Sequence, residues 1–203
     1  MKLSVIIPVY NEARTIVEIL KKINVQKKYF DLEIIVSDDC STDHTRKLLE
    51  NHKNLYDKIY LSKKNFGKGS AIKSAKNLIS GDIVIIQDAD MEYDPSDYKF
   101  LVEPIVNNLS KVVYGSRVLK KKRYDMKNFL SLWRIFFNQL LTIISNIVNK
   151  QNLTDAHTCY KVFSTDVFNK INLEEKGFAF CPEVNCKISN MDIKILEVPI
   201  NYN

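Results

Sequence analysis

The chain has 203 residues, of which 45% are hydrophobic and 27% charged, with only five glycines and five prolines. This composition excludes a disordered, collagen-like or linker protein and fits one compact domain with a substantial core. The formal net charge of +6 indicates anionic partners without distinguishing a nucleotide, a nucleic acid or a membrane surface.

Strands and helices alternate through the first half of the chain. Apolar, β-branched runs predict strands at residues 3–9, 32–36, 58–61, 83–86 and 112–114. Between them, apolar residues at helical spacing predict helices at 16–23, from Ser41 or Thr42 to Leu49, at 67–79 and after Pro95. We expect Asn11 to cap the first helix. The alternation predicts a mostly parallel α/β sheet with helices on both faces and ligands at the carboxyl ends of the strands.

The second half has a different character. A basic run at 120–123 precedes a segment, 129–148, in which apolar residues recur every three or four positions. This pattern predicts one amphipathic helix or two in tandem, either in the core or lying in a membrane interface. Further strands are predicted at 159–163 and 193–200, and helices after Ser164 and Pro182. The N-terminal apolar run is too short for a signal peptide, and no transmembrane helix is predicted.

Acidic residues follow three of the predicted strands. They are Glu12, Asp38 with Asp39, and Asp88 with Asp90. Helix capping accounts for one such cluster, but three at one sheet edge indicate a binding site. Asp88 and Asp90 are two residues apart after a strand, so in extended chain their side chains point the same way. Beside a nucleoside diphosphate, such a pair binds Mg²⁺ or Mn²⁺ together with phosphate oxygens.

Several other kinds of site are disfavoured. The turn at 8–12 lacks the glycines of a dinucleotide-binding motif, and the stretch at 65–70 lacks P-loop spacing, although Lys68 and nearby backbone N–H groups can face a ligand. The basic run is short and has no interleaved aromatic residues, so nucleic acid is not predicted as a partner. The four cysteines are scattered and are expected to be reduced.

Eight short motifs occur in an order typical of one family: VIIPVYNE, SDDCSTDHT, NFGKGSAI, QDADMEYDP, VYGSR, LTDAHTCYKVF, GFAFCPEV and EVPINY. Together they resemble family 2 glycosyltransferases, and most of all the branch of dolichyl-phosphate and polyprenyl-phosphate hexosyltransferases. The resemblance spans nearly the whole chain. It implies a GT-A (Rossmann-like) fold over 1–203, with a nucleotide-sugar-binding half at 1–118 and an acceptor-facing half at 119–203. It also implies a nucleotide-sugar donor, a divalent metal and inversion at the anomeric carbon.

The resemblance carries roles onto individual residues. It places the donor against Pro8, Tyr10, Glu12, Asp38, Asp39, Lys68, Asp88, Ala89 and Asp90. The metal ligands would be Asp88, Asp90 and Glu92, the last at a position where relatives often carry glutamine. Arg117 would contact a phosphate and, with the metal, stabilise the departing nucleoside diphosphate.

The identity of the acceptor stays open at this level. A lipid phosphate is already an anion and needs no general base, which favours hexose transfer from GDP-mannose or UDP-glucose to a polyprenyl phosphate. The protein would then be cytoplasmic and peripheral on the cytosolic membrane face, docked through 120–149. A saccharide hydroxyl would need a base, for which Asp155 is the candidate. A third hypothesis is a non-catalytic nucleotide-sugar-binding module, and the amphipathic segment could also serve self-association.

The end of the sequence departs from this branch. Its members usually continue beyond the EVPINY motif into a basic stretch, and many then add transmembrane helices, whereas this sequence stops at Asn203. We therefore expect either a piece of a longer protein or a short soluble form, in which the missing basic stretch would weaken binding of a diphosphate or a lipid phosphate.

Overall fold

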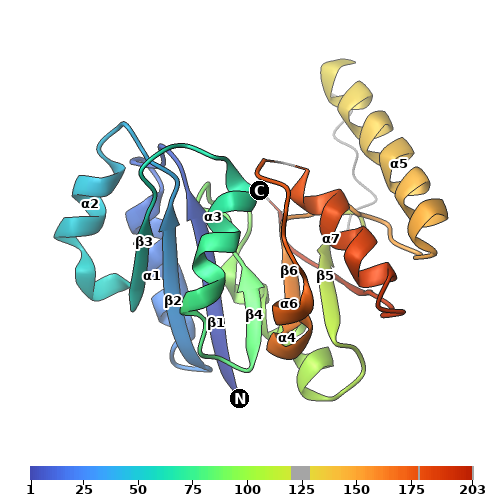
Figure 1. The fold of residues 1–203 in the computed structure, drawn as a ribbon, viewed down its shortest axis with the longest axis horizontal. Coiled ribbons are helices and arrows are strands. Elements are labelled where there is room, and N and C mark those ends of the chain that lie inside the picture. Colours follow the sequence, from blue (N-terminus) through green and yellow to red (C-terminus); the bar gives the residue numbers. More distant parts are fainter. Residues whose placement is uncertain (120–128, 178, 203) are drawn as a thin grey trace.

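A seven-stranded sheet forms the centre of the computed structural model, which describes residues 1–119, 129–177 and 179–202 and, within these, the side chains of all but 129–136. The strand order is β3-β2-β1-β4-β6-β5-β7 (Figure 1). The strands are β1 (Lys2–Val9), β2 (Asp31–Asp38), β3 (Lys58–Leu61), β4 (Ile83–Ile86), β5 (Val112–Ser116), β6 (Lys161–Ser164) and β7 (Leu196–Pro199). The basic run at 120–123 lies outside the described residues.

The sheet is mostly parallel, as predicted. β1 pairs in parallel with β2 and β4, β2 with β3, and β5 with β7. The exception is β6, which lies antiparallel to both β4 and β5. Since β6 comes from the second half of the chain, both halves contribute to one sheet, and the division at 118 and 119 stays a prediction.

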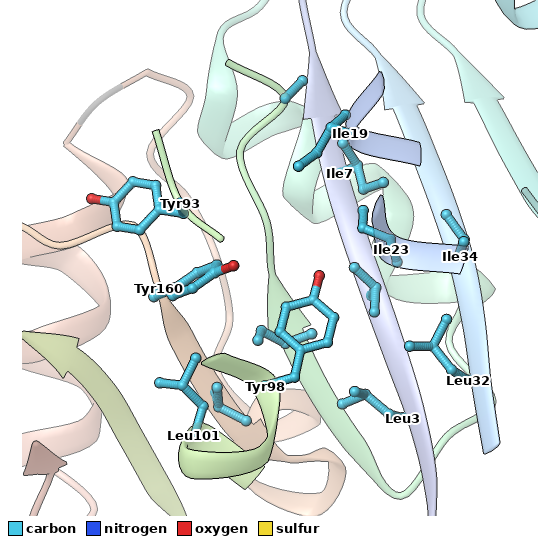
Figure 2. Close-up of a cluster of buried hydrophobic side chains, with 14 of the residues drawn as sticks. Leu3, Ile7, Ile19, Ile23, Leu32, Ile34, Tyr93, Tyr98, Leu101 and Tyr160 are labelled. Carbon is cyan, nitrogen blue, oxygen red and sulfur yellow. The ribbon is translucent and has the colours of Figure 1, made fainter. Parts of the chain in front are cut away.

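Helices cover both faces of the sheet (Figure 1). They are α1 (Ile16–Gln26), α2 (Thr45–Asn51), α3 (Lys68–Ala75), α4 (Tyr98–Val106), α5 (Phe129–Asn149), α6 (Thr165–Lys170) and α7 (Phe180–Ser189), with short 3₁₀ turns at Lys53–Leu55, Lys76–Leu78 and Pro95–Asp97. One core cluster packs α1 and α4 against one face of the sheet (Figure 2), and a second packs α3, α6 and α7 against the other. Successive side chains of β1 point to opposite faces of the sheet, so Val5 and Ile7 belong to the first cluster and Ile6 to the second.

The cap expected for the first helix and the start expected for the second differ from the structure. α1 begins at Ile16, and Asn11 does not cap it. Instead Asn11 adopts a φ of 56°, and its Oδ1 accepts hydrogen bonds from the backbone N–H groups of Thr42 and Asp43, at 2.8 and 3.3 Å. The prediction for Asn11 was wrong because its side chain joins two loops at the carboxyl edge. The same loop contacts delay α2 until Thr45.

The amphipathic segment forms one helix, α5, which stands beside α7 at one end of the sheet (Figure 1). Its apolar side faces away from the protein, and the exposed fractions of its seven large apolar residues between 137 and 148 run from 41% to 74%. Thr142 and Asn149, on its polar side, are buried. This arrangement is the reverse of a core helix. Among the described residues, no helix combines the length and apolar character needed to span a bilayer.

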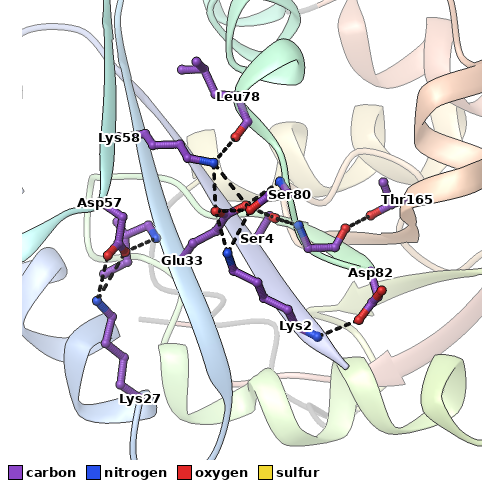
Figure 3. Close-up of polar contacts among 12 residues, drawn as sticks. Lys2, Ser4, Lys27, Glu33, Asp57, Lys58, Leu78, Ser80, Asp82 and Thr165 are labelled. Atoms are coloured by element: carbon purple, nitrogen blue, oxygen red, sulfur yellow. Dashed lines mark hydrogen bonds and ion pairs between the residues drawn. The ribbon is translucent and has the colours of Figure 1, made fainter.

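A polar network closes the opposite edge of the sheet, near the amino ends of β1 and β2 (Figure 3). The buried Glu33 carboxylate accepts hydrogen bonds from the hydroxyls of Ser4 and Ser80, both at 2.6 Å. The ammonium groups of Lys58 and Lys2 lie 3.0 and 3.1 Å from the same side chain. A buried charge that is paired and hydrogen-bonded in this way holds three strands together.

Candidate active site at the carboxyl edge of the sheet

A cavity of about 330 Å³ opens at the carboxyl ends of β1, β2 and β4. It is lined by Pro8, Val9, Tyr10, Glu12, Asp39, Asn65, Gly67, Lys68, Ala71, Asp88, Ala89 and Asp90. Eight of the nine residues that the sequence assigns to the donor are in this set. The strands end at a common edge because they are parallel, which brings together residues that are up to 82 positions apart.

Asp38 is the donor residue that does not line the cavity. It is fully buried, and its carboxylate accepts hydrogen bonds from Arg46 Nε at 2.6 Å and from the backbone N–H of Ser41 at 3.2 Å. Arg46 also donates to the carbonyl oxygen of Ser62 at 2.6 Å. Asp38 thus anchors the loops behind the cavity, while its neighbour Asp39 faces the cavity.

Asp39 shapes the loop that begins α3. Its carboxylate accepts hydrogen bonds from the backbone N–H groups of Phe66 and Gly67, at 3.0 and 2.5 Å. Gly67 has a φ of 93°, and a Cβ atom there would lie 2.8 Å from the carbonyl oxygen of Lys176. Only glycine fits this turn, which brings Lys68 to the cavity wall.

Lys68 and Asp88 form an ion pair inside the cavity. The Lys68 Nζ lies 2.5 Å from Asp88 Oδ1 and 3.0 Å from the Sγ of Cys159. Burial lowers the pKa of Lys68, but the Asp88 carboxylate outweighs burial and the net pKa is raised. Lys68 therefore carries a permanent positive charge where a phosphate of a bound nucleotide would need one.

Asp90 experiences an excess of negative charge. Desolvation, followed by the charges of Asp88, Glu92 and Glu12, raises the pKa of Asp90 to about 6, against a hydrogen bond from the Glu92 backbone N–H that lowers it. The Asp90 Oδ1 accepts that bond at 3.1 Å. A carboxylate in this position favours a cation beside it.

The three expected metal ligands are not gathered around one point. Glu92 accepts a hydrogen bond from the hydroxyl of Tyr202 at 2.6 Å, and Asp88 is paired with Lys68. Within the described part of the chain, no group of three His, Cys, Asp or Glu side chains is placed to hold a metal ion. Mg²⁺ commonly binds through one or two carboxylates plus phosphate oxygens, so Asp88 and Asp90 fit an ion that is completed by a bound diphosphate.

Arg117 and Asp155 face each other in a bidentate pair. Arg117 Nε and Nη2 donate to the two carboxylate oxygens of Asp155 at 2.7 and 2.8 Å, and the Arg117 backbone N–H donates at 3.2 Å. Burial lowers the pKa of Arg117, while Asp155 outweighs burial and raises it. The guanidinium also stacks on the ring of Tyr202, 5.2 Å from its centroid. With five N–H groups, a guanidinium can hold a carboxylate on one edge and meet a phosphate with another.

Sequence reasoning missed Gln87, which supports the loop that carries Asp88 and Asp90. The side chain is fully buried, and its amide nitrogen donates to the carbonyl oxygens of Asp88 and Tyr93, at 3.0 and 3.3 Å. Its amide oxygen accepts from the hydroxyls of Tyr98 and Tyr160, at 2.9 and 2.6 Å, whose rings lie in the core (Figure 2). A polar residue that ends an otherwise apolar strand is the signal that could have revealed it.

Tyr202 was also missed as a member of the site. Its ring packs edge-on against Tyr93, with centroids 5.2 Å apart, while its hydroxyl holds Glu92 and its face carries Arg117. It thereby joins the acidic side of the site to the Arg117–Asp155 pair. The EVPINY motif gave its position in the sequence but no sign of these contacts.

Known proteins share this sequence pattern and fold. The family model described as "Glycosyl transferase family 2" matches residues 4–171. The chain is 27% identical to a dolichyl-phosphate beta-glucosyltransferase of Trichomonas vaginalis, with 99% of this chain and 65% of that protein covered. It is 27% identical to a dolichol-phosphate mannosyltransferase of Pyrococcus furiosus, with 100% and 56% covered. The chain thus spans less than two thirds of the length of these two relatives.

The fold has solved counterparts as well. A glucosyl-3-phosphoglycerate synthase from Mycobacterium tuberculosis, solved in complex with Mn²⁺, UDP and glucosyl-3-phosphoglycerate, superimposes with a TM-score of 0.73. The superposition covers 100% of this chain and 72% of that chain, at 18% identity. The expected GT-A architecture is confirmed. From its motifs, its fold and the family match over residues 4–171, the chain belongs to glycosyl transferase family 2.

Proposed function

We propose that the protein transfers a hexose from a nucleotide sugar to a polyprenyl phosphate at the surface of a membrane, with inversion at the anomeric carbon. The observation that carries this proposal is the cavity lined by Lys68, Asp88 and Asp90, together with the Arg117–Asp155 pair, which Tyr202 joins to Glu92. The names of the relatives from Trichomonas vaginalis and Pyrococcus furiosus support a dolichyl-phosphate type of acceptor.

The donor would occupy the cavity with its diphosphate at the acidic end. Asp88 and Asp90 would hold a divalent cation together with the diphosphate oxygens, and Ala89 would allow the backbone close approach between them. When bound, such a cation stabilises the charge that develops on the departing nucleoside diphosphate. Lys68 would add a fixed positive charge on the same side. A solved relative of the same fold binds Mn²⁺ and UDP, which supports this assignment of the metal.

The acceptor side favours an anionic nucleophile. Both carboxylate oxygens of Asp155 accept hydrogen bonds from Arg117, so Asp155 is poorly placed to take a proton from a hydroxyl. Arg117 is instead held where its guanidinium can orient a phosphate that is already ionised. This pairing argues against the alternative of a saccharide hydroxyl as acceptor, and we infer that Asp155 positions Arg117.

α5 would seat the protein on the lipid that carries the acceptor. Its exposed apolar side is formed by Phe137, Leu140, Leu141, Ile143, Ile144, Ile147 and Val148. An exposed apolar surface of this extent marks a contact with another protein or with a membrane, and the interfacial region of a bilayer accepts it. A peripheral position on the cytosolic face follows from this proposal, because nucleotide sugars are supplied there.

A transfer assay tests the proposal directly. Protein, Mn²⁺ and each of GDP-mannose, UDP-glucose and UDP-N-acetylglucosamine are mixed with polyprenyl phosphate in vesicles, and glycolipid is measured by mass spectrometry. We expect a product with one donor, its loss in Arg117→Gln, and its retention in the exposed control Arg14→Gln. Glycosylation of a saccharide acceptor alone would overturn the choice of acceptor. Donor binding without transfer to any acceptor would indicate a binding module.

A further inference from the structure

The side chain of Asn146, on the polar side of α5, forms two hydrogen bonds with the backbone of one residue in the segment that follows the helix. Its amide nitrogen donates to the carbonyl oxygen of Leu153, and its amide oxygen accepts from the N–H of Leu153, both at 2.8 Å. One side chain thus pairs with both backbone groups of one residue, in the manner of a strand neighbour. Leu153 itself is buried in the second core cluster.

The segment 153–156 is held from several directions. The Ala156 N–H donates to Thr142 Oγ1 of α5 at 3.4 Å, and the Ala156 carbonyl oxygen accepts from Asn185 of α7 at 3.2 Å. On the other side, Glu197 of β7 accepts from the N–H groups of Thr154 and Asp155, at 2.6 and 2.9 Å. The segment therefore has a defined register between α5 and the sheet.

This register decides where Arg117 lies. Asp155 is two residues beyond Leu153, and its carboxylate fixes the guanidinium of Arg117 through the bidentate pair. A shift of the segment would carry Asp155 with it and displace the guanidinium of Arg117. Small displacements of a positioning group have large effects on reactivity.

We propose that Asn146 is a positioning residue, which holds Asp155 in register with α5 and thereby places Arg117 for the acceptor phosphate. The same contact links the helix whose apolar side would lie on the membrane to the group that would meet the lipid phosphate. The inference rests on the proposed function for its catalytic meaning, while the structural link can be measured without any activity.

The structural link is tested by amide hydrogen exchange on the full chain. The Arg117 N–H donates to Asp155, so its exchange rate reports the position of Asp155. We expect faster exchange of the Arg117 amide in Asn146→Ala than in the wild type. Asn149→Ala is the matched control, because Asn149 donates within α5 to Ser145. Equal Arg117 exchange in both variants and the wild type would overturn the proposal.

The kinetic consequence is tested with vesicles that contain polyprenyl phosphate. We expect Asn146→Ala to raise the KM for the lipid phosphate roughly tenfold, with nucleotide affinity and vesicle binding unchanged. Its effect should not add to that of Asp155→Ala, because both act through Arg117. Additive effects, or an unchanged KM in an active variant, would refute the link and leave the proposed function standing.

A failure of the proposed function can be told apart from a failure of the link between Asn146 and Arg117. If the wild type transfers to no polyprenyl phosphate, the function is refuted, and the hydrogen-exchange result alone decides the link. Should Asn146→Ala not fold, Asn146→Asp serves in its place, since it keeps an acceptor for the Leu153 N–H but sets a carboxylate oxygen against the Leu153 carbonyl oxygen. Faster Arg117 exchange than in the wild type is then the expected result, and a wild-type rate would contradict the proposal.

Discussion

The charged residues in and near the cavity form ion pairs, except for one carboxylate that would be stabilised by a bound cation. Lys68 and Asp88 neutralise each other, and Arg117 and Asp155 do the same, but Asp90 stands among like charges. The apolar strand before Asp88 and Asp90 was enough to predict that both lie at the carboxyl edge of the sheet. The pairing of Asp88 with Lys68 and of Glu92 with Tyr202 was not predictable, because each pair joins residues from distant parts of the chain.

Asp90→Asn should separate binding from stability. Since folding raises the pKa of Asp90 from 3.8 to about 6, the folded protein loses stability as pH rises through this range. The variant should therefore unfold at a higher temperature than the wild type without metal. This difference in stability between the variant and the wild type should be absent below pH 4 and fully present above about pH 6. Because the residue is exposed, we expect at most ~1 kcal/mol.

The measurement is thermal unfolding at pH 4 and pH 7.5, with and without Mn²⁺ and UDP. Metal with nucleotide should stabilise the wild type and leave the variant nearly unchanged. Asp43→Asn is a suitable control, since its hydrogen bonds lower the pKa of Asp43, overcoming desolvation, and the variant should lose stability. A destabilised Asp90→Asn protein at pH 7.5 would contradict this account of the charge cluster.

At the scale of elements, the spacing of apolar residues predicted where a helix lies but not which of its sides faces the protein. The repeat of apolar residues gave α5 its place and length within one residue, because a 3.6-residue period is a property of the sequence alone. It did not say which side of the helix faces the protein. The side that faces the protein is set by hydrogen bonds to distant backbone groups. The N–H groups of Leu153 and Ala156 donate to the side chains of Asn146 and Thr142 on α5. The loop contacts of Asn11 escaped prediction for the same reason.

Replacing Ile147 and Val148 by serine should weaken membrane binding without unfolding the protein. Both side chains are largely exposed, at 74% and 69%, so their loss costs little packing in the folded state. We expect co-sedimentation with anionic vesicles to fall at least tenfold, with the unfolding temperature nearly unchanged. Val25→Ser on α1, also exposed, controls for general loss of apolar surface. Unfolding of the double variant would show that α5 is buried against protein.

At the scale of the whole molecule, stability and ligand binding occupy opposite edges of the sheet. The acidic cavity lies at the carboxyl edge, and the Glu33 network ties β1, β2 and the segment before β4 at the other (Figure 3). The alternation of strands and helices was sufficient to predict the sheet and its parallel character. The insertion of β6 was not predictable, since strand order depends on which edges pair rather than on the composition of a strand.

Glu33→Gln should lower global stability while leaving the carboxyl edge intact. Burial raises the pKa of Glu33, but hydrogen bonds from Ser4, Ser80 and Lys58 outweigh burial and hold the pKa far below 4.5. The stabilisation is therefore present above pH 4.5 and is lost as pH falls below it. We expect a loss of about 3 kcal/mol at pH 7.

Urea unfolding at pH 7 and pH 3 measures this difference. The gap between wild type and variant should narrow at the lower pH, whereas nucleotide affinity at pH 7 should be equal in both. Glu50→Gln, at an exposed position of α2, should change neither quantity. A gap that stays constant between the two pH values would indicate that shape rather than charge stabilises the network.

The place of β6 also governs how the chain can fold during its synthesis. Among the described strands, β5 pairs only with β6 and β7, and both of these are made after it. Once the first 118 residues have left the exit tunnel, they can therefore form four strands of the sheet, with an open edge at β4, and a fifth strand with no partner. Closure waits until residue 164 has left the exit tunnel. During that interval the exposed edges are open to pairing with other chains, so this protein should depend on chaperones that shield nascent strands.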